Sequence, residues 1–162
     1  MPGPLDGHRI VDLTTMISGP MATCLLADQG ADVIKVESPG VGDLVRRLGV
    51  SKEGITATFA TTNRNKRSIV LDLKQAHDRE AFERLVATAD VVVQNFRPGV
   101  AERMGIGEPD LRRLRPDLVY VSISGFGETG PYAHKRVYDP IVQALSGLAT
   151  IQGNRGAGRL TR

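Results

Sequence analysis

The chain is poor in the residues that mark disulfide-bonded and membrane proteins. It has one cysteine among 162 residues, Cys24, so no internal disulfide can form, and a reducing, cytoplasmic location is expected. Cys24 lies among leucines, which predicts a buried packing role rather than a reactive thiol. No apolar run approaches the ~20 residues that a membrane helix needs, and residues 1–8 do not resemble a signal peptide. We therefore expect no membrane partner.

Aromatic residues and excess charge are also scarce. Only 4% of the residues are aromatic, and the formal net charge is +3. The few aromatics do not alternate with basic residues as they do in single-strand binders, so no nucleic-acid partner is expected. The histidines, His8, His77 and His134, have no partner at helical spacing and no cysteine nearby, so no metal site is predicted. The length and the 41% hydrophobic content suit one soluble globular domain.

The stretch that begins at Ser18 predicts a helix followed by a strand. Ser18 is expected as the N-cap, Pro20 suits the first turn, and Gly30 ends the helix. A β-branched strand follows over 31–36, and another apolar strand precedes the helix over 9–13. Together they form a βαβ unit whose helix N-terminus faces the carboxyl end of the first strand. Folds of this class bind anionic ligands at that place.

The rest of the chain continues this alternation. Further strands are predicted over 68–72, 90–94 and 118–123, and further helices over 76–89, 108–115 and 138–148. The polar segment 45–60 is expected to be an irregular surface excursion. The pattern predicts an α/β, Rossmann-like fold with an open, mostly parallel sheet and helices on both faces. We expect one domain over 1–153 and a disordered tail over 154–162.

Two segments are candidate anion sites. The loop from Asp12 to Pro20 carries no GxGxxG, so a dinucleotide fingerprint is absent; it is either a backbone N–H site for a phosphate or an ordinary helix start. Arg64, Lys66 and Arg67 are clustered beside a predicted strand, and Lys74 follows that strand. The cluster is either a solvated basic face or a phosphate site.

Two further segments could carry chemistry. Asn95, Phe96 and Arg97 follow a buried strand, where they could hydrogen-bond an adenine edge, stack on it and pair with a phosphate, or form a mere turn. Asp139 precedes the last helix and is either a catalytic carboxylate or a residue of the helix start.

Several of these motifs in one order resemble a known family. The segments LDGHRIVDLTTMISGPMATCLLADQGADVIKVESPGVGD, NRNKRSIVLDLK, ADVVVQNFRPGVAERMGI, LVYVSISGFGETGPY and YDPIVQALSGL are similar to the N-terminal part of the class III CoA-transferases of the CaiB/BaiF type. Formyl-CoA transferase, carnitine CoA-transferase and the α-methylacyl-CoA racemases belong to this family. The resemblance covers residues 4–153.

The resemblance implies a CoA-binding, Rossmann-like portion of a larger fold in which two chains interlock as a homodimer. Coenzyme A or acyl-CoA would be the substrate, without a metal. The implied CoA contacts are Ile17, Ser18, Leu71, Lys74, Asn95, Phe96, Arg97, Arg103 and Arg136. One position departs from the pattern: many members carry Arg where this chain has Ser38. That loss should weaken adenine or phosphate contacts unless Arg46 or Arg47 substitutes.

The resemblance also separates two activities. The racemases carry a histidine acid–base group where this chain has Tyr138, so the chain resembles the transferase branch, which moves CoA from an acyl-CoA to a carboxylic acid acceptor. In the family the nucleophilic aspartate lies beyond the segment that ends here at Arg162. No catalytic residue is therefore assigned, and we expect the chain to be inactive alone. The alternatives are an acyl-CoA racemase relative and a non-catalytic CoA-binding fragment.

Overall fold

The computed structural model describes residues 3–152, which divide into two units between Ile123 and Ser124. The tail expected over 154–162 lies outside the described residues. Within the described part, no helix has both the length and the apolar character needed to cross a membrane.

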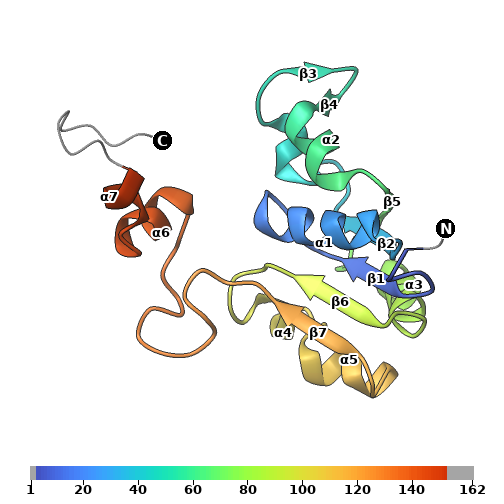
Figure 1. Ribbon diagram of the computed structural model, residues 1–162. Coiled ribbons are helices and arrows are strands. Elements are labelled where there is room, and N and C mark those ends of the chain that lie inside the picture. Colours follow the sequence, from blue (N-terminus) through green and yellow to red (C-terminus); the bar gives the residue numbers. More distant parts are fainter. Residues whose placement is uncertain (1–2, 153–162) are drawn as a thin grey trace. The chain divides into compact units, whose positions relative to one another are not determined.

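The first unit is built on a five-stranded sheet in which every neighbouring pair of strands is parallel (Figure 1). The strand order is β5-β2-β1-β6-β7. The strands are β1 (Arg9–Asp12), β2 (Asp32–Glu37), β5 (Lys66–Val70), β6 (Val91–Gln94) and β7 (Val119–Ser122). This confirms the predicted parallel α/β fold, and each predicted strand is present within about two residues of its expected position.

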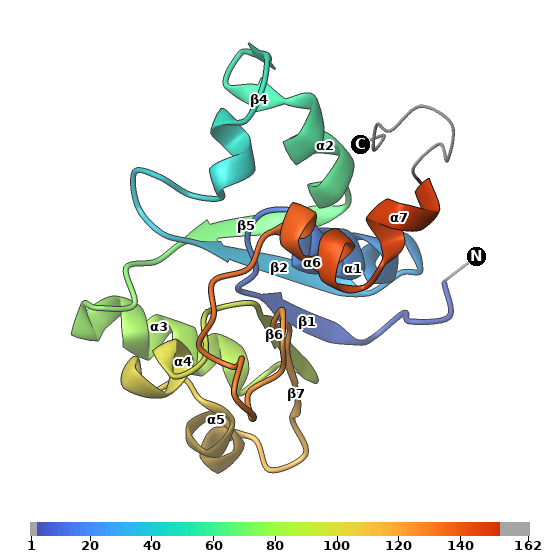
Figure 2. The same cartoon turned by 90° about the vertical axis from the view of Figure 1, so that its left-hand side faces the viewer.

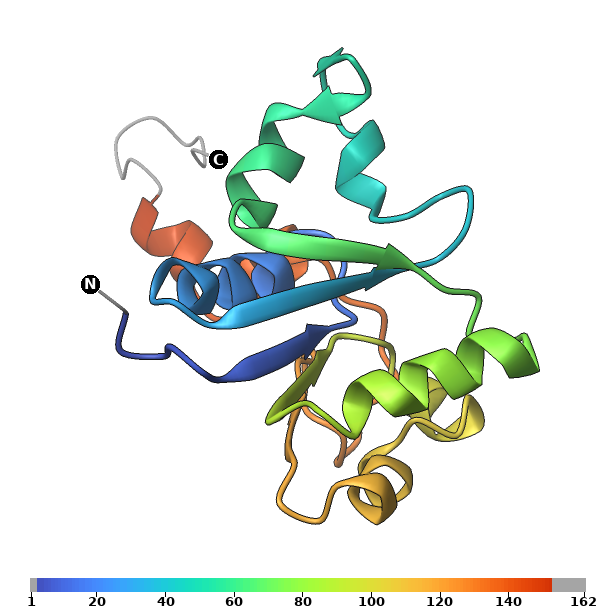
Figure 3. The same ribbon diagram turned by 90° about the vertical axis from the view of Figure 1, so that its right-hand side faces the viewer.

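Helices cover both faces of the sheet. Helix α1 lies on one face, and α3, α4 and α5 lie on the other (Figures 2 and 3). The helices are α1 (Ser18–Asp28), α2 (Ala57–Asn63), α3 (Ala76–Val86), α4 (Val100–Arg103) and α5 (Glu108–Leu114). Helix α2 packs beside α1 and follows a small antiparallel hairpin of β3 (Ser51–Lys52) and β4 (Ile55–Thr56). Cys24 is fully buried and directs its thiol toward the carbonyls of Thr61 and Arg64, which confirms its packing role.

The core has two layers, one on each face of the sheet. Alternate residues of each strand enter opposite layers, as the pleat requires. Val11 and Val92 pack with Phe82 and Leu111 on the α3–α5 face. Ile10, Val33 and Val93 pack with Ala27 on the α1 face.

The start of α1 differs from the prediction. Ile17, not Ser18, is the N-cap: its carbonyl accepts the first helical bond from Met21 N at 2.8 Å, and no side chain caps the helix. Tertiary contacts already hold the preceding loop, so the helix begins without the local cap that Ser18 would supply. Its end is as predicted, because Gly30 follows the C-cap with φ +100° and bonds back to the Ala27 carbonyl.

Two other segments differ from the prediction: one has more regular structure than expected, and the other is a helix that is interrupted. Residues 45–60 are not an irregular excursion: they contain most of a short 3-10 helix, η1 (Leu44–Arg47), then the β3–β4 hairpin and the start of α2. In the second unit, the helix predicted over 138–148 is broken into α6 (Asp139–Leu145) and α7 (Leu148–Gln152). Gly147, with φ +79°, separates the two.

Candidate functional site

A pocket opens at the carboxyl ends of the parallel strands. It is lined by the loops that follow β1, β2, β5 and β6 and by the end of α4; its residues are Leu13, Thr14, Thr15, Lys35, Val36, Glu37, Ser38, Gly42, Asp43, Leu71, Asp72, Leu73, Lys74, Phe96 and Met104. From β1 the chain runs to β2 on one side and later returns to β6 on the other. Open α/β sheets bind ligands at such a switch point.

The pocket has one apolar wall, with an exposed lysine beside it. Leu71 and Leu73 come from the loop after β5, and Phe96 and Met104 come from the loop after β6 and the end of α4. Phe96 and Met104 are partly buried against the core. Lys74 is exposed beside this wall. The arrangement suits a ligand with a flat, apolar part and an anionic part.

The structure brings together some of the predicted site residues and not others. Leu71, Lys74 and Phe96 line the same pocket, although the loops that carry them are far apart in sequence. The other predicted residues lie outside its lining: Asn95 and Arg97 flank Phe96, Arg103 precedes Met104, Ile17 and Ser18 are exposed at the start of α1, and Arg136 is exposed in the second unit.

The basic residues near the pocket differ in their ion pairing from the basic cluster after α2, which consists of Arg64, Lys66 and Arg67. Within residues 3–152, no carboxylate forms an ion pair with Lys74, Arg97 or Arg103. By contrast, the cluster is fully paired: Arg64 binds Asp28, Lys66 binds Asp12 and Arg67 binds Asp32. Lys66 is thus buried in its ion pair, whereas Arg64 and Arg67 lie on a solvated face, and each of the three cations already has a carboxylate partner.

Asn95, whose contact to CoA stays a prediction, also forms hydrogen bonds within the protein. Its Oδ1 accepts from the N–H of Thr15 at 3.0 Å, and its Nδ2 donates to the carbonyl of Thr15 at 2.8 Å. The side chain therefore joins the loop after β6 to the loop after β1. These bonds use one of its two N–H donors and one of the two lone pairs of its oxygen.

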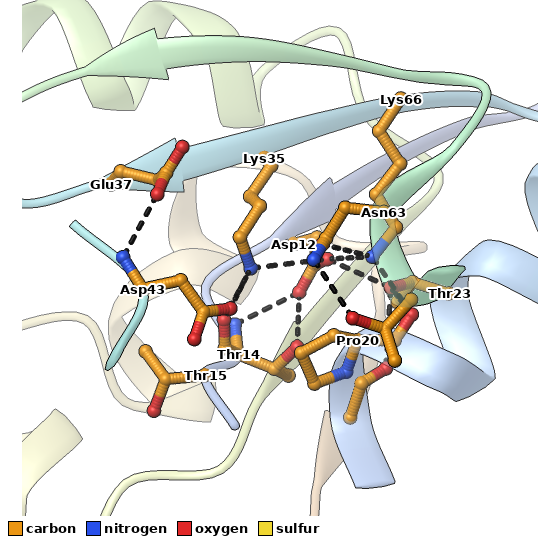
Figure 4. A network of polar contacts seen from close by, with 12 residues as sticks. Asp12, Thr14, Thr15, Pro20, Thr23, Lys35, Glu37, Asp43, Asn63 and Lys66 are labelled. Carbon is orange, nitrogen blue, oxygen red and sulfur yellow. Dashed lines mark hydrogen bonds and ion pairs between the residues drawn. The ribbon is translucent and has the colours of Figure 1, made fainter. Parts of the chain in front are cut away.

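Beside the pocket lies a buried network of charges (Figure 4). Lys66 Nζ is 2.9 Å from Asp12 Oδ2, and Lys35 Nζ is 2.9 Å from Asp43 Oδ2 and 4.0 Å from Asp12 Oδ2. Burial raises the pKa of Asp12, but the two ammonium groups and the Thr14 hydroxyl outweigh it, and the pKa is lowered. Burial lowers the pKa of Lys66 in spite of Asp12. Two cations balance two anions here, so the network has no net charge.

Glu37, at the end of β2, occupies the place where dinucleotide-binding folds hold the acid that takes ribose hydroxyls. Here that acid is already engaged by Arg46 at 2.8 and 2.6 Å, by the N–H of Asp43 and by Ser68 Oγ. Burial raises its pKa, but these donors prevail and lower it to about 2. The Glu37 carboxylate is thus already bonded within the protein, which agrees with the absence of the GxGxxG dinucleotide fingerprint.

The cations that could replace the missing Arg at position 38 are also engaged. Arg46 binds Glu37 and lies 3.7 Å from the centre of the Phe59 ring. Arg47 Nη2 donates to the Gly40 carbonyl at 2.9 Å. Ser38 lines the pocket, and of these two arginines Arg46 is paired with a carboxylate, whereas the exposed Arg47 bonds only to a backbone carbonyl among the described residues.

One catalytic candidate from the sequence has a structural role. Asp139 is the first residue of α6, in the second unit, and its carboxylate accepts from Gln143 Nε2. This favours the helix-start interpretation. In the part of the chain that the structure describes, no three His, Cys, Asp or Glu residues gather in a way that could hold a metal ion.

Sequence reasoning missed Lys35 and Asp43. A signal existed for Lys35, since it is a lysine within a β-branched strand at a position where period-two alternation places buried residues. Asp43 lies in a glycine-rich loop with no periodic pattern, and its partners come from distant segments.

Comparison with known proteins agrees with this geometry. Residues 5–160 match the model of CoA-transferase family III. The chain is 47% identical over 151 residues to acetyl-CoA:oxalate CoA-transferase from Acetobacter aceti, covering 93% of this chain and 39% of that protein. It is 44% identical over 151 residues to mouse succinyl-CoA:glutarate CoA-transferase, covering 93% of this chain and 35% of that protein. The chain thus spans little more than a third of the length of these relatives.

Solved structures give the same result. A CaiB/BaiF family protein from Brucella suis superposes with a TM-score of 0.92 and 41% identity, over 100% of this chain and 43% of that one. Rv3272 from Mycobacterium tuberculosis superposes with a TM-score of 0.86 and 37% identity, over 99% of this chain and 45% of that one. The chain belongs to CoA-transferase family III, and its parallel sheet corresponds to part of the fold of these longer proteins.

Proposed function

We propose that this chain is the CoA-binding part of a family III CoA-transferase. The observation that carries the proposal is the joining of Leu71, Lys74 and Phe96 in one pocket at the carboxyl edge of the sheet. Phe96 and the leucines offer an apolar surface to an adenine ring. Lys74, with Arg97 and Arg103 beside the pocket, supplies cations that no described carboxylate neutralises, and these suit the phosphates of CoA.

The proposed reaction moves CoA from an acyl-CoA to a carboxylic acid, which releases the first acid and forms the second acyl-CoA. The relatives named above act on oxalate and on glutarate, which are both dicarboxylic acids. We propose the same class of acceptor for the transferase to which this chain corresponds. Because the chain covers 35–39% of those relatives, the transfer step is proposed for the longer protein, and the binding step for this chain.

Isothermal titration of the 162-residue chain with CoA tests the binding step. Lys74→Ala and Arg97→Ala should each weaken binding, because a hydrogen bond to a charged group contributes roughly 1.5–3 kcal/mol, or roughly 10- to 150-fold in Kd. Arg84→Ala is the matched control, since Arg84 is an exposed cation on α3 that pairs with Glu80. Wild-type affinity in both Lys74→Ala and Arg97→Ala would contradict the proposal.

A further inference from the structure

The loop between β1 and α1 holds a residue in an unfavourable backbone conformation. Met16 has φ +70°, in the left-handed region that non-glycine residues avoid at a cost of about 1–2 kcal/mol. A methionine side chain offers no local hydrogen bond to offset this cost. The surrounding structure must therefore hold the loop.

Side chains from three other parts of the fold supply that hold. Asp43 Oδ1, from the loop after β2, accepts from the N–H of Met16 at 3.0 Å. Lys35 Nζ, from β2 itself, donates to the carbonyl of Thr14 at 2.7 Å. Asn95, after β6, holds both the N–H and the carbonyl of Thr15. Three consecutive loop residues are thus each fixed by a residue distant in sequence.

Asp43 connects these contacts. The same Oδ1 also accepts from the N–H of Val45 at 3.1 Å, while Oδ2 lies 2.9 Å from Lys35 Nζ. The side chain of Asp43 is fully buried, so it can act on a bound molecule only through the groups that it holds. Lys35 and Asp43 together therefore tie β2 and the loop after it to the backbone of residues 14–16.

The held loop forms part of the pocket. Thr14 and Thr15 line it, and Met16 leads directly into Ile17 and the first turn of α1. If Met16 returned to a right-handed or extended conformation, the wall made by Thr14 and Thr15 would move. We propose that Asp43 is a positioning residue, which fixes the Thr14–Met16 loop through the Met16 amide in the conformation that receives CoA. This inference rests on the proposed CoA-binding function.

Two double variants isolate the contact to Met16. Lys35→Met with Asp43→Asn removes both charges and keeps an oxygen that can accept from the Met16 N–H. Lys35→Met with Asp43→Ala removes the same charges and that oxygen as well. The two proteins have equal charge and differ in the acceptor. The measurements are CoA affinity by titration and hydrogen exchange of the Met16 amide by NMR.

The alanine double variant should bind CoA at least ten times more weakly than the asparagine double variant, and its Met16 amide should exchange faster. Adding Met16→Gly to it should restore part of the affinity, since glycine adopts positive φ without strain. Leu118→Val, a core change at the amino end of β7, is the stability control and should alter neither readout. Rescue by glycine would not follow from a general loss of stability.

The proposal would be overturned if the two double variants bound CoA equally well while Leu118→Val kept the wild-type CoA affinity and Met16 exchange rate. If the wild-type chain does not bind CoA, the proposed function fails, yet the Met16 exchange rates still decide whether Asp43 holds the loop. If the alanine double variant does not fold, Asp43→Asn alone should keep the protection of the Met16 amide, and loss of that protection would overturn the proposal.

Discussion

Lys35 Nζ lies 2.9 Å from Asp43 Oδ2, and the two side chains are 1% and 0% exposed. Burying two charges costs several kcal/mol for each ion, which their attraction repays only with good geometry and further hydrogen bonds. Here the further bonds go to the backbone of Thr14, Met16 and Val45. The pair thus orders two segments beside the pocket, the loop over 14–16 and the start of η1, a result that an apolar pair of similar volume would not reproduce.

The second buried pair gives a direct stability prediction. Lys66→Met leaves Asp12 with the more distant ammonium of Lys35, at 4.0 Å, and should lower the free energy of unfolding by about 3–5 kcal/mol. Arg84→Met breaks an exposed pair with Glu80 and should cost about 0.5 kcal/mol. Urea denaturation of both variants measures the difference. Similar losses in the two would show that the burial of Lys66 and Asp12 has no special energetic effect.

Glu37 should make the protein sensitive to acid. Its folded pKa of about 2 lies below the ordinary value of 4.5, so the unfolded chain binds the proton more readily. The stability that Glu37 contributes is therefore fully present above pH 4.5 and is lost as the pH falls through 4.5 toward 2. The loss amounts to up to about 3 kcal/mol.

Substitution of Glu37 tests that dependence. Glu37→Gln should lower stability at pH 7 and make its decline between pH 5 and pH 2 shallower. Asp12 and Asp32, whose pKa values are also lowered against the effect of burial, should maintain part of the decline. Chemical denaturation across this pH range gives the slope of stability against pH for the wild type and for Glu37→Gln. Parallel curves for the wild type and the variant would contradict the assignment.

Gly19 packs against Thr14 so closely that a side chain is excluded. A Cβ at this position would lie 2.4 Å from Thr14 Cβ. In an exposed helix Gly→Ala stabilises by roughly 1 kcal/mol, but here the clash should make Gly19→Ala destabilising by about 1–3 kcal/mol. Ser18→Ala, at the exposed neighbouring position, is the control. Thermal unfolding gives the sign, and a stabilised Gly19→Ala protein would contradict this packing.

The sheet could be predicted from the sequence because its strands carry local signals. Apolar, β-branched runs mark the buried strands, and Gly30 marks the end of α1 in the left-handed conformation. The hairpin and α2 carry no such signal. There Thr56 caps α2 by accepting from Phe59 N and also donates to the Val45 carbonyl, while Arg46 packs on the Phe59 ring. The contacts of Thr56 with Val45 and of Arg46 with Phe59 join residues more than ten positions apart, where periodicity gives no information.

The candidate site was predictable to the extent that strand ends mark it. Leu71, Lys74 and Phe96 follow β5 and β6, and the family resemblance implies the same residues. The function of Asn95 was not predictable, because its partner Thr15 is 80 positions away. The same holds for Asp43, whose contact to Met16 depends on how two loops meet. Pairings of this kind are decided by tertiary packing and leave no local pattern.

The last prediction concerns chemistry. Three carboxylates line the pocket, and each is engaged: Glu37 by Arg46, Asp43 by Lys35 and backbone amides, and Asp72 by the N–H of Lys74 at 3.1 Å. A nucleophilic carboxylate must reach the acyl carbon, and the first two are buried behind their partners. The 162-residue chain should therefore bind acyl-CoA without transferring CoA to a dicarboxylic acid.

Mass spectrometry of the chain mixed with an acyl-CoA and a dicarboxylate acceptor tests this expectation. No second acyl-CoA should form, and no acyl adduct should appear on the protein. Asp139 is the carboxylate that the sequence left as a catalytic candidate, and its side chain is exposed at the start of α6. Asp139→Ala should leave CoA affinity unchanged, since the carboxylate contacts Gln143 within its own helix. Transfer by the wild-type chain that disappears in Asp139→Ala would make Asp139 the nucleophile and this assignment wrong.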